Sequence, residues 1–327
     1  MTCLCCGILF ADIACWPISH LPDEGELVTT DKIELNLGGC ASNVAFDLAR
    51  LGVPVTLAGG VGDDALSEFI VRTLSIPAID TRFLQQFPGY CPGTAMHINV
   101  HDQDRRFICT TGANDLFVFN DDIFRYIEND KDSQENQNPA PKILYLGGFF
   151  MLRGLENERT IQLLDTAQKH GWTTILDVVL NGHRPYWEIL EPILPYADIF
   201  LPNEHEGEKI TNYRDPYDQS KMFLEAGAKT VLITQGEGGT LCFGTEEQFR
   251  AGIYPTDYIS GSGAGDAFCA GLIAALLEGL NLRDALRWGS AVGASCVRGV
   301  STTETVFNRK ELSAFLNEHS LVIENIE

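Results

Sequence analysis

Strand-like and helix-like patterns alternate along most of this 327-residue chain, and this alternation limits the folds open to it. Short apolar runs of the kind found in buried strands are followed by longer stretches with helical spacing. Strands are expected at 143–146, 173–177, 198–201 and 229–234, and helices at about 157–170, 187–194, 219–226, 264–278 and 282–297. Such repeats predict an α/β fold with a mostly parallel sheet covered by helices on both faces.

The first half of the chain adds strands of a more exposed kind. Residues 4–10 form an apolar run typical of a core strand, whereas residues 16–37 contain proline and then alternate polar with apolar side chains. Two further β-type runs, 93–100 and 105–109, predict a hairpin.

Two other segments of this half are simpler to interpret. A helix is expected to begin near Asp63, which would cap it, and to continue to Leu74. Residues 128–142 are polar and end in proline, and we interpret them as a solvated loop with no role in the chemistry.

The charge balance of the chain excludes some classes of partner. The sequence has 45 acidic and 23 basic residues, a formal net charge of −22. A field of this sign repels nucleic acid and anionic membrane surfaces, so we expect neither as a partner. A phosphorylated ligand would therefore be held by local donors or by a metal ion.

The ten cysteines favour a reducing compartment. Three of them lie in the apolar run near the N-terminus, and others are scattered singly through apolar contexts, which is typical of buried thiols. The run at 4–14 is interrupted by Asp12 and has no basic region before it, so it is a poor signal peptide, and no apolar run reaches transmembrane length. We expect a cytoplasmic protein.

Residues 260–268, Ser-Gly-Ser-Gly-Ala-Gly-Asp-Ala-Phe, combine small side chains with the start of an apolar helix. The first N–H groups of a helix have no internal partners, and together with the helix dipole they favour a phosphate. Asp266 beside such a site makes chemical sense if it accepts a proton. Taken alone, the segment is equally compatible with an ordinary loop and helix cap.

Polar residues also follow several of the expected strands, namely Asp12, Asp177, Asn203 with Glu206, and Thr234 with Gly236. Because the carboxyl ends of parallel strands share one edge of a sheet, these side chains are expected to converge. Each one alone is typical of a turn or cap, so it is the set that predicts a cleft.

The motifs of the chain, in their order, resemble those of the ribokinase-like (PfkB-type) carbohydrate kinases. They are Asp12, Gly38-Gly39-Cys40-Ala41-Ser42-Asn43 with Gly52 and Gly62, Asn203-Glu204-His205-Glu206, Thr234-Gln235-Gly236 and Gly263-Ala264-Gly265-Asp266. The resemblance covers residues 4–316. It implies a single domain over residues 1–327 with a three-layer α/β/α ribokinase-like fold, a mostly parallel central sheet and a small β lid from about 13–37 and 93–110.

The resemblance also implies an activity, the ATP-dependent phosphorylation of a hydroxyl of a small sugar. Asp266 is the implied general base, and Gly263, Ala264 and Gly265 form the implied anion hole. The implied sugar-binding residues are Asp12, Gly38, Gly39 and Asn43. ATP and Mg²⁺ are expected at Asn203, Glu206, Thr234 and Gly236, with Glu206 holding Mg²⁺ through water. Walker, nucleophile-elbow and dinucleotide motifs do not fit the glycine loops.

One departure from the family pattern concerns a monovalent cation. Ser260-Gly261 stands where the second family signature commonly has Asp-Thr, and that Asp helps to bind an activating cation in many members. We therefore expect weak or absent activation by K⁺.

The substrate is less constrained. Residues 108–114 replace the Tyr-Tyr-Arg-type lid segment of acid-sugar kinases, so the sequence favours a neutral, unphosphorylated sugar. Arg105, Arg106 and Arg184 could each reach an anionic group or lie solvated. A nucleoside kinase is the alternative, and a sugar-binding or regulatory protein without turnover is a third possibility, against which Asp266 argues. Open lid edges favour a homodimer formed through the lid.

Overall fold

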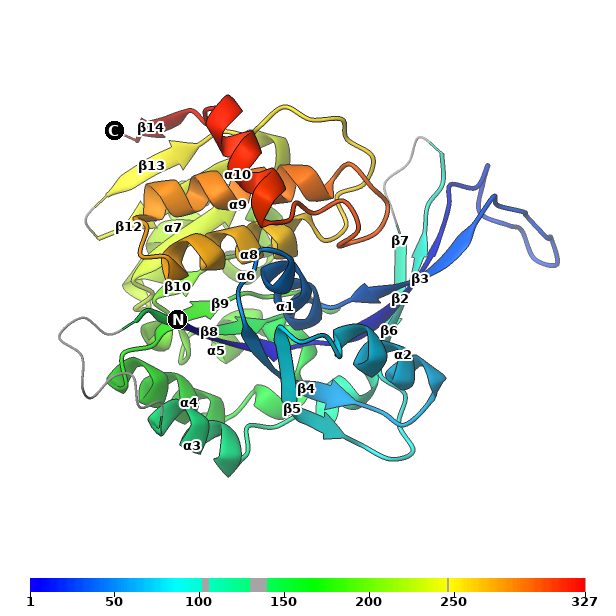
Figure 1. The fold of residues 1–327 in the computed structure, drawn as a ribbon, viewed down its shortest axis with the longest axis horizontal. Coiled ribbons are helices and arrows are strands. Elements are labelled where there is room, and N and C mark those ends of the chain that lie inside the picture. The colour runs from blue at the N-terminus through cyan, green and yellow to red at the C-terminus, as the bar shows by residue number, and fades with distance from the viewer. Residues whose placement is uncertain (102–105, 130–139, 246, 327) are drawn as a thin grey trace.

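The computed structural model describes residues 1–101, 106–129, 140–245 and 247–326, within which the strands form a large central sheet and a smaller one that projects from it (Figure 1). In spatial order the central sheet contains β14 (Ile323–Asn325), β13 (Gln248–Ala251), β12 (Thr240–Gly244), β11 (Thr230–Thr234), β10 (Ile199–Phe200), β9 (Thr173–Leu176), β8 (Lys142–Gly147), β1 (Thr2–Gly7), β4 (Val55–Val61) and β5 (Ile79–Gln86). Pairing is parallel from β11 to β5 and antiparallel from β11 to β14. The expected mostly parallel sheet is confirmed.

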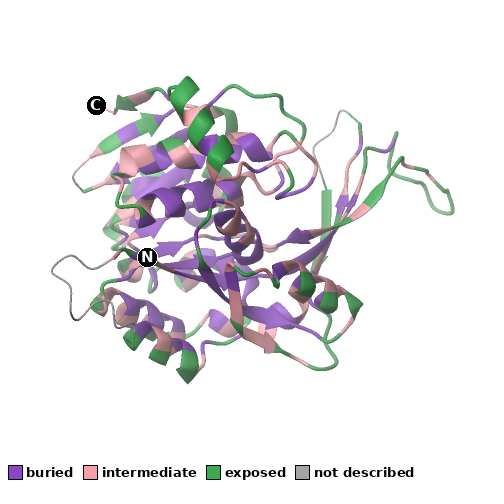
Figure 2. Cartoon of the chain, viewed as in Figure 1, coloured by how far each residue is buried: buried purple, intermediate pink, exposed green. Residues whose placement is uncertain are grey.

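Helices cover both faces of this sheet. One face carries α1 (Cys40–Arg50), α2 (Ala65–Leu74), α8 (Ala264–Leu277), α9 (Leu282–Cys296) and α10 (Arg309–Glu318), and the other carries α3 (Asp121–Glu128), α4 (Glu158–Lys169), α5 (Tyr186–Leu190), α6 (Glu204–Thr211) and α7 (Pro216–Glu225). Successive side chains of β1 point to opposite faces, so Cys3 and Cys5 pack with the first set of helices and Leu4 and Cys6 with the second. The buried strands therefore form the middle of three layers (Figure 2).

Helix α8 is buried on nearly every side. Of its 14 residues, ten are buried, which explains why its sequence has no polar stripe. A Cβ at Gly271 would lie 2.7 Å from the carbonyl oxygen of Trp288, so this glycine permits the close packing of α8 on α9. The neighbouring helices thus fix the direction in which the N-terminus of α8 points.

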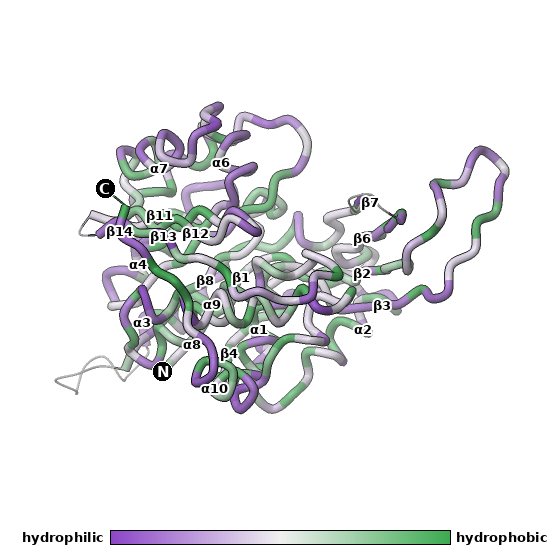
Figure 3. Tube along the Cα trace, turned by 90° about the horizontal axis from the view of Figure 1, so that it is seen from above, coloured by the Kyte–Doolittle hydropathy of each residue, from purple (hydrophilic) through white to green (hydrophobic). Residues whose placement is uncertain are grey.

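The smaller sheet is the expected lid. Its strands, in spatial order, are β3 (Ile33–Gly38), β2 (Phe10–Cys15), β6 (Gly93–Ile98) and β7 (Arg106–Thr110). β6 and β7 pair antiparallel, as the hairpin prediction requires. Figure 3 shows this sheet extending away from the helical layers. Its exposed apolar side chains include Ile33, Leu35, Met96 and Ile108.

Two expectations from the sequence are wrong, namely the extent of the first strand and the residue that caps α2. The apolar run at 4–10 is divided between β1 and β2, so Asp12 lies within a lid strand and not at the end of a core strand. Helix α2 is capped by Asp64, whose Oδ1 accepts the Ser67 N–H at 2.8 Å, whereas Asp63 accepts the N–H of Gly89. Arg105 and residues 130–139 of the polar loop lie outside the described residues.

The backbone that connects β1 to β2 is held by the side chain of Asn114, 105 residues after Leu9. Asn114 accepts the Leu9 N–H through Oδ1 at 3.0 Å and donates from Nδ2 to the Leu9 carbonyl oxygen at 2.9 Å. Asn114 is fully buried in the 3₁₀ helix at Gly112–Leu116. Its amide therefore satisfies the backbone groups of Leu9 between the two sheets.

Among the described residues, no helix combines the length and the apolar character needed to cross a bilayer. The single-domain organisation over residues 1–327 stays a prediction.

Asp47 is an unusual residue for the buried face of α1. Its side chain is completely buried, and within the described part of the chain neither carboxylate oxygen has a hydrogen-bond partner. Burial and the nearby charge of Asp266 raise the pKa of Asp47 well above its ordinary value, with a smaller opposing effect from Arg50. Burial of this carboxyl therefore lowers the stability of the fold at any pH at which Asp47 is ionised in the unfolded chain.

We expect Asp47→Ala to be more stable than the parent protein at pH 8 by about 1–3 kcal/mol. Above about pH 4 the Asp47 carboxyl loses its proton in the unfolded chain but keeps it in the folded chain. The parent therefore loses stability as the pH rises from about 4 towards the raised pKa of Asp47 in the folded chain. Urea unfolding at pH 5 and pH 8 should show the advantage of the variant growing with pH. The exposed residue Asp23 provides the control, because Asp23→Ala should change little at either pH. A parent and an Asp47→Ala variant of equal stability at both pH values would contradict this account.

Candidate active site

The N-terminus of α8 is a set of uncapped backbone donors. Gly263 is the cap residue, with φ of 78° and no side-chain cap hydrogen bond. A Cβ at Gly263 would lie 2.6 Å from the carbonyl oxygen of Thr302, so both the backbone conformation and the packing require glycine here. A Cβ at Gly265 would meet no atom within 4 Å. The space beside Gly265 can therefore hold a ligand against the first N–H groups of the helix.

A second glycine turn begins α1. Gly39 caps α1 with φ of 90°, and a Cβ there would lie 2.5 Å from the carbonyl oxygen of Ile8. The Gly38 Cα packs against the carboxylate of Asp12, because an added Cβ would lie 2.1 Å from Asp12 Oδ2. The Gly38-Gly39 turn thus packs closely against the backbone between β1 and β2 and against the lid strand that carries Asp12.

The two glycine-initiated helices meet through a side-chain hydrogen bond. Asn43, in the first turn of α1, donates from Nδ2 to Asp266 Oδ2 at 2.7 Å. Asn43 is 2% exposed, and its Oδ1 lies 3.2 Å from the hydroxyl of Thr302. The amide is therefore held with its donor towards Asp266, which orients the carboxylate.

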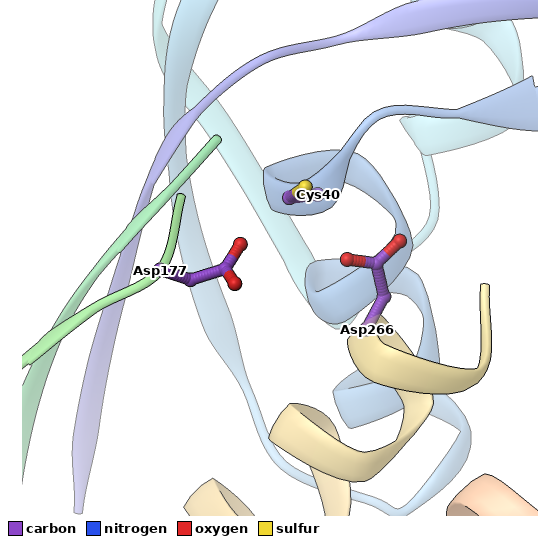
Figure 4. Close-up of side chains that lie close together, drawn as sticks. All are labelled: Cys40, Asp177 and Asp266. Atoms are coloured by element: carbon purple, nitrogen blue, oxygen red, sulfur yellow. The ribbon is translucent and has the colours of Figure 1, made fainter. Parts of the chain in front are cut away.

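Two further residues face Asp266. Figure 4 shows the Cys40 thiol and the carboxylate of Asp177 directed into the same space as the Asp266 carboxylate. The possible ligand atoms of these three residues lie within 4.8 Å of one another. Asp177 comes directly after β9, and its Oδ2 accepts hydrogen bonds from Tyr145 OH at 3.2 Å and Gly148 N–H at 3.3 Å.

The environment of these carboxyls raises their pKa values. Burial raises the pKa of Asp266 to about 6, although hydrogen bonds from Asn43 and Cys40 oppose the rise. Burial and the charge of Asp266 raise the pKa of Asp177 to about 7. Burial and the charge of Asp177 raise the pKa of Glu206 well above its ordinary range. Perturbed carboxyls grouped in this way are typical of functional sites.

The remaining motif residues lie at the ends of β10 and β11. Asn203 and Glu206 form a capping box on α6, in which Glu206 Oε2 accepts the Asn203 N–H and Asn203 Oδ1 accepts the Glu206 N–H, each at 2.9 Å. A parallel bridge joins Asn203 to Thr234, and Gly236 follows with φ of 56°. The structure thus brings Asn203, Thr234 and Gly236 to neighbouring strand ends, as the sequence predicts.

A cavity of about 750 Å³ lies beside this motif. Its lining includes Asn203, Glu206, Trp187, His205 and Lys209, together with Arg184. Arg184 forms a two-pronged ion pair with Glu156 and also donates to the Phe150 carbonyl oxygen at 2.9 Å. The uncertain role of Arg184 is therefore resolved in part, since its guanidinium holds the loop after β9 in place.

Asp12 has a partner that the sequence does not reveal. His97 of β6 places Nε2 3.3 Å from Asp12 Oδ2, and both side chains are 8% exposed. The ring of Phe107 packs edge-on against His97 with 4.6 Å between the ring centroids. The alternation of buried and exposed residues along β6 could have indicated an inward-facing His97.

The structure brings Asp177 to Asp266, as the expected convergence of strand-end residues requires. The sequence does not indicate two other residues near Asp266. Cys40 lies inside a recognised motif without a role of its own, and Thr302 belongs to a loop without any pattern. Residues such as Thr302 reach the site only through the tertiary fold, so no local sequence pattern indicates them.

Comparison with known proteins identifies the class that this fold and site define. The model of the pfkB family of carbohydrate kinases matches residues 2–316. The chain therefore belongs to the PfkB family, and it is an ATP-dependent carbohydrate kinase.

Similar proteins span nearly its full length. A 5-dehydro-2-deoxygluconokinase of Geobacillus kaustophilus is 24% identical over 92% of this chain and 89% of the relative. An ATP-dependent 6-phosphofructokinase of Thermoanaerobacterium thermosaccharolyticum is 26% identical over 85% of this chain and 84% of the relative. The structure of Arabidopsis thaliana ribokinase complexed with ribose and ATP aligns with a TM-score of 0.78, 24% identity and coverage of 96% and 97%. This likeness confirms the ribokinase-like fold.

We expect Gly265→Ala to fold normally and to lose kinase activity. The added methyl meets no protein atom, but it would occupy the space beside the free N–H groups of α8. Removing a single donor from such a site typically lowers turnover by about 10²–10³, and a loss of this order is expected. Gly263→Ala is the contrasting variant, because its strained backbone and its contact with Thr302 should lower the melting temperature. Full activity in Gly265→Ala would show that no part of the substrate binds in the space beside Gly265.

The pH dependence of kcat/KM should report the Asp266 carboxyl. A base must be ionised to accept a proton, so activity should fall as the pH drops through about 6. Asn43→Leu removes a donor that favours the ionised form, and the acid limb should move upward by about 1–2 pH units. Ser42→Ala provides the control, since its hydroxyl bonds to the Gly39 carbonyl oxygen and should leave the limb in place. An unmoved limb in Asn43→Leu would contradict this assignment.

Proposed function

We propose that this kinase transfers the γ-phosphoryl group of ATP to a hydroxyl of a small sugar, with Asp266 as general base and Gly263, Ala264 and Gly265 as the anion hole. The observation that carries the proposal is the position of Asp266, held by Asn43 beside the uncapped N-terminus of α8. A proton acceptor and a phosphate-binding helix start therefore lie within the same turn of helix.

This arrangement supplies what phosphoryl transfer needs. The reaction depends on positioning and on stabilisation of charge more than on covalent chemistry. With a pKa of about 6, Asp266 is largely ionised at neutral pH and can take the proton of the attacking hydroxyl. The α8 N–H groups are placed to bind the oxygens of the transferred group.

The residues at the edge of the sheet fit Mg²⁺. Glu206 uses Oε2 in the capping box, which leaves Oε1 for the ion or for its bound water. Oxygen donors and retained waters are the coordination that Mg²⁺ prefers, and the bound ion would neutralise phosphate charge. Asn203, Thr234 and Gly236 are the proposed contacts of the nucleotide phosphates, because they share the same strand ends.

The proposed sugar site lies between the lid and the Gly38-Gly39 turn. Asp12 is the proposed acceptor for sugar hydroxyls, and its packing against Gly38 and His97 fixes its position. Asn43 is proposed to contact the sugar as well, although its Nδ2 is already bonded to Asp266. Burial of these groups makes each hydroxyl contact selective.

A neutral sugar remains the proposed substrate, with a nucleoside as the alternative. The two curated relatives bear names that refer to a gluconate derivative and to a phosphofructose, and both of these carry an anionic group. On the lid, Asp12 and His97 pair with each other, which supports a neutral ligand beside these two residues. A non-catalytic sugar-binding role is disfavoured by the retained base.

ADP release across a matched panel would decide among these substrates. The panel should contain ribose, fructose, fructose 6-phosphate, gluconate derivatives and nucleosides, at fixed Mg²⁺ and ATP. The proposal predicts the highest kcat/KM for a neutral sugar. Preference for a phosphorylated or acidic sugar would overturn the neutral assignment, and saturable sugar binding without ADP release would favour the non-enzyme.

Two expectations stay predictions. Ser260 replaces the cation-binding Asp of relatives, and its hydroxyl accepts the Ser262 N–H at 3.2 Å, which supports weak K⁺ activation. The exposed apolar residues of the lid support a homodimer through that sheet.

We expect Asp266→Asn to lower turnover by about 10²–10⁴, the usual contribution of a general base, while ATP affinity stays nearly unchanged. Asparagine keeps the shape of the side chain and an oxygen for the Asn43 donor, so the fold should be retained. Steady-state kinetics and nucleotide titration measure the two effects separately. Turnover within threefold of the parent would exclude this role for Asp266.

A further inference from the structure

We infer that Cys40, Asp177 and Asp266 form a site for a thiophilic divalent cation, Zn²⁺ in particular, which would inhibit the kinase by occupying its base. The three residues come from separate elements, the start of α1, the end of β9 and the start of α8. Their possible ligand atoms lie within 4.8 Å of one another and face a common space (Figure 4).

The oxygens not used by the protein are available to such an ion. Asp266 Oδ2 accepts from Asn43, and Asp177 Oδ2 accepts from Tyr145 and Gly148. The remaining contact of both carboxyls is the Cys40 thiol, which would become a ligand of the same ion. Outer hydrogen bonds of this kind orient metal ligands in known sites. The carboxylates are thus already held in the manner of supported ligands.

The thiol makes the site selective. Cys40 is 7% exposed, and its Sγ lies within 4.8 Å of a carboxylate oxygen of each aspartate. A sulfur ligand favours Zn²⁺ over Mg²⁺, and one sulfur with two oxygens supplies the three protein ligands of an open tetrahedral site. Ligand atoms around zinc stand about 3.3–3.5 Å apart, so side-chain rotations that draw these atoms together by up to about 1.5 Å would complete the site.

The local charge also favours a cation. Within the residues that the structure describes, neither Asp177 nor Asp266 forms an ion pair with a basic side chain. Binding would release the Cys40 thiol proton, and the Asp177 proton where that carboxyl is protonated, to solvent. Bonds from zinc to sulfur and to the two carboxylate oxygens would replace water molecules of the hydrated ion. Affinity should therefore rise with pH, and the zinc-bound Asp266 could no longer accept a proton.

The test begins with binding, which does not depend on the proposed kinase mechanism. The full chain, carrying Cys91→Ser and Cys109→Ser to remove two exposed thiols, would be titrated calorimetrically with Zn²⁺ alone. Co²⁺ in place of Zn²⁺ should give a sulfur-to-cobalt charge-transfer absorption. Cys40→Ala should lose one equivalent of bound zinc, or at least about tenfold in affinity, together with this absorption.

Cys269→Ala is the matched control. This buried thiol lies one turn after Asp266 on α8, and its own pKa is raised by burial and by Asp177, yet it is outside the cluster. The variant should keep both the zinc equivalent and the cobalt absorption. Equal zinc binding by the parent and Cys40→Ala, with both variants folded by melting temperature, would overturn the site.

Inhibition is the second readout, and it alone depends on the proposed function. Micromolar Zn²⁺ at saturating Mg²⁺ and ATP should lower kcat in the parent, and a chelator selective for Zn²⁺ should restore it. In Cys40→Ala, inhibition relative to the variant's own activity should require at least about tenfold more Zn²⁺. Zinc binding through Cys40 without any loss of turnover would refute Asp266 as the base while leaving the metal site intact.

Discussion

The hydrogen bond from Asn43 to Asp266 joins the two halves of the active site, and the rest of the arrangement depends on it. The donor lies in the first turn of α1 and the acceptor in the first turn of α8, and each helix starts at a glycine whose backbone no other residue could adopt at low cost. Because α8 is packed on all sides, it cannot turn to accommodate a misplaced partner. The bond therefore fixes the position of the proposed sugar-binding turn relative to the proposed phosphate-binding helix start.

The same bond moderates the electrostatics of the cleft. Burial raises the pKa values of several carboxyls there, and their mutual repulsion adds to this effect. Hydrogen bonds act in the opposite direction, from Asn43 and Cys40 on Asp266 and from Cys40, Gly148 and Tyr145 on Asp177. The two pKa values lie near 6 for Asp266 and near 7 for Asp177. Carboxyls whose pKa values are raised towards neutral pH can accept and release protons in that range.

Features of the fold and site that neighbouring residues determine could be predicted from the sequence, whereas those that depend on contacts between distant residues could not. Helix α8 was expected at 264–278 and is found at Ala264–Leu277, because its apolar run and glycine start are local signals. Helix α6, in contrast, was not expected, since its sequence Glu-His-Glu-Gly-Glu-Lys-Ile-Thr has almost no apolar periodicity. The run at 4–10 hides a break that is stabilised by Asn114, and no pattern near Leu9 could reveal it. The pairing of Asn43 with Asp266 spans 223 positions and is equally invisible to local reasoning.

The clamp of Asn114 on Leu9 divides the proposed sugar site into a fixed and an adjustable part. Asp12 follows Leu9 by three residues, so its position is tied to β1 and to the core. His97 and Phe107 belong to β6 and β7, which lie beyond that anchor. His97 pairs with Asp12, so it is the outermost strand β7, with Phe107, that can change and reshape the wall of the proposed site while Asp12 stays in place. Diversification of substrate range within this scaffold can thus proceed through the outermost lid strand while the proposed contact for sugar hydroxyls stays constant.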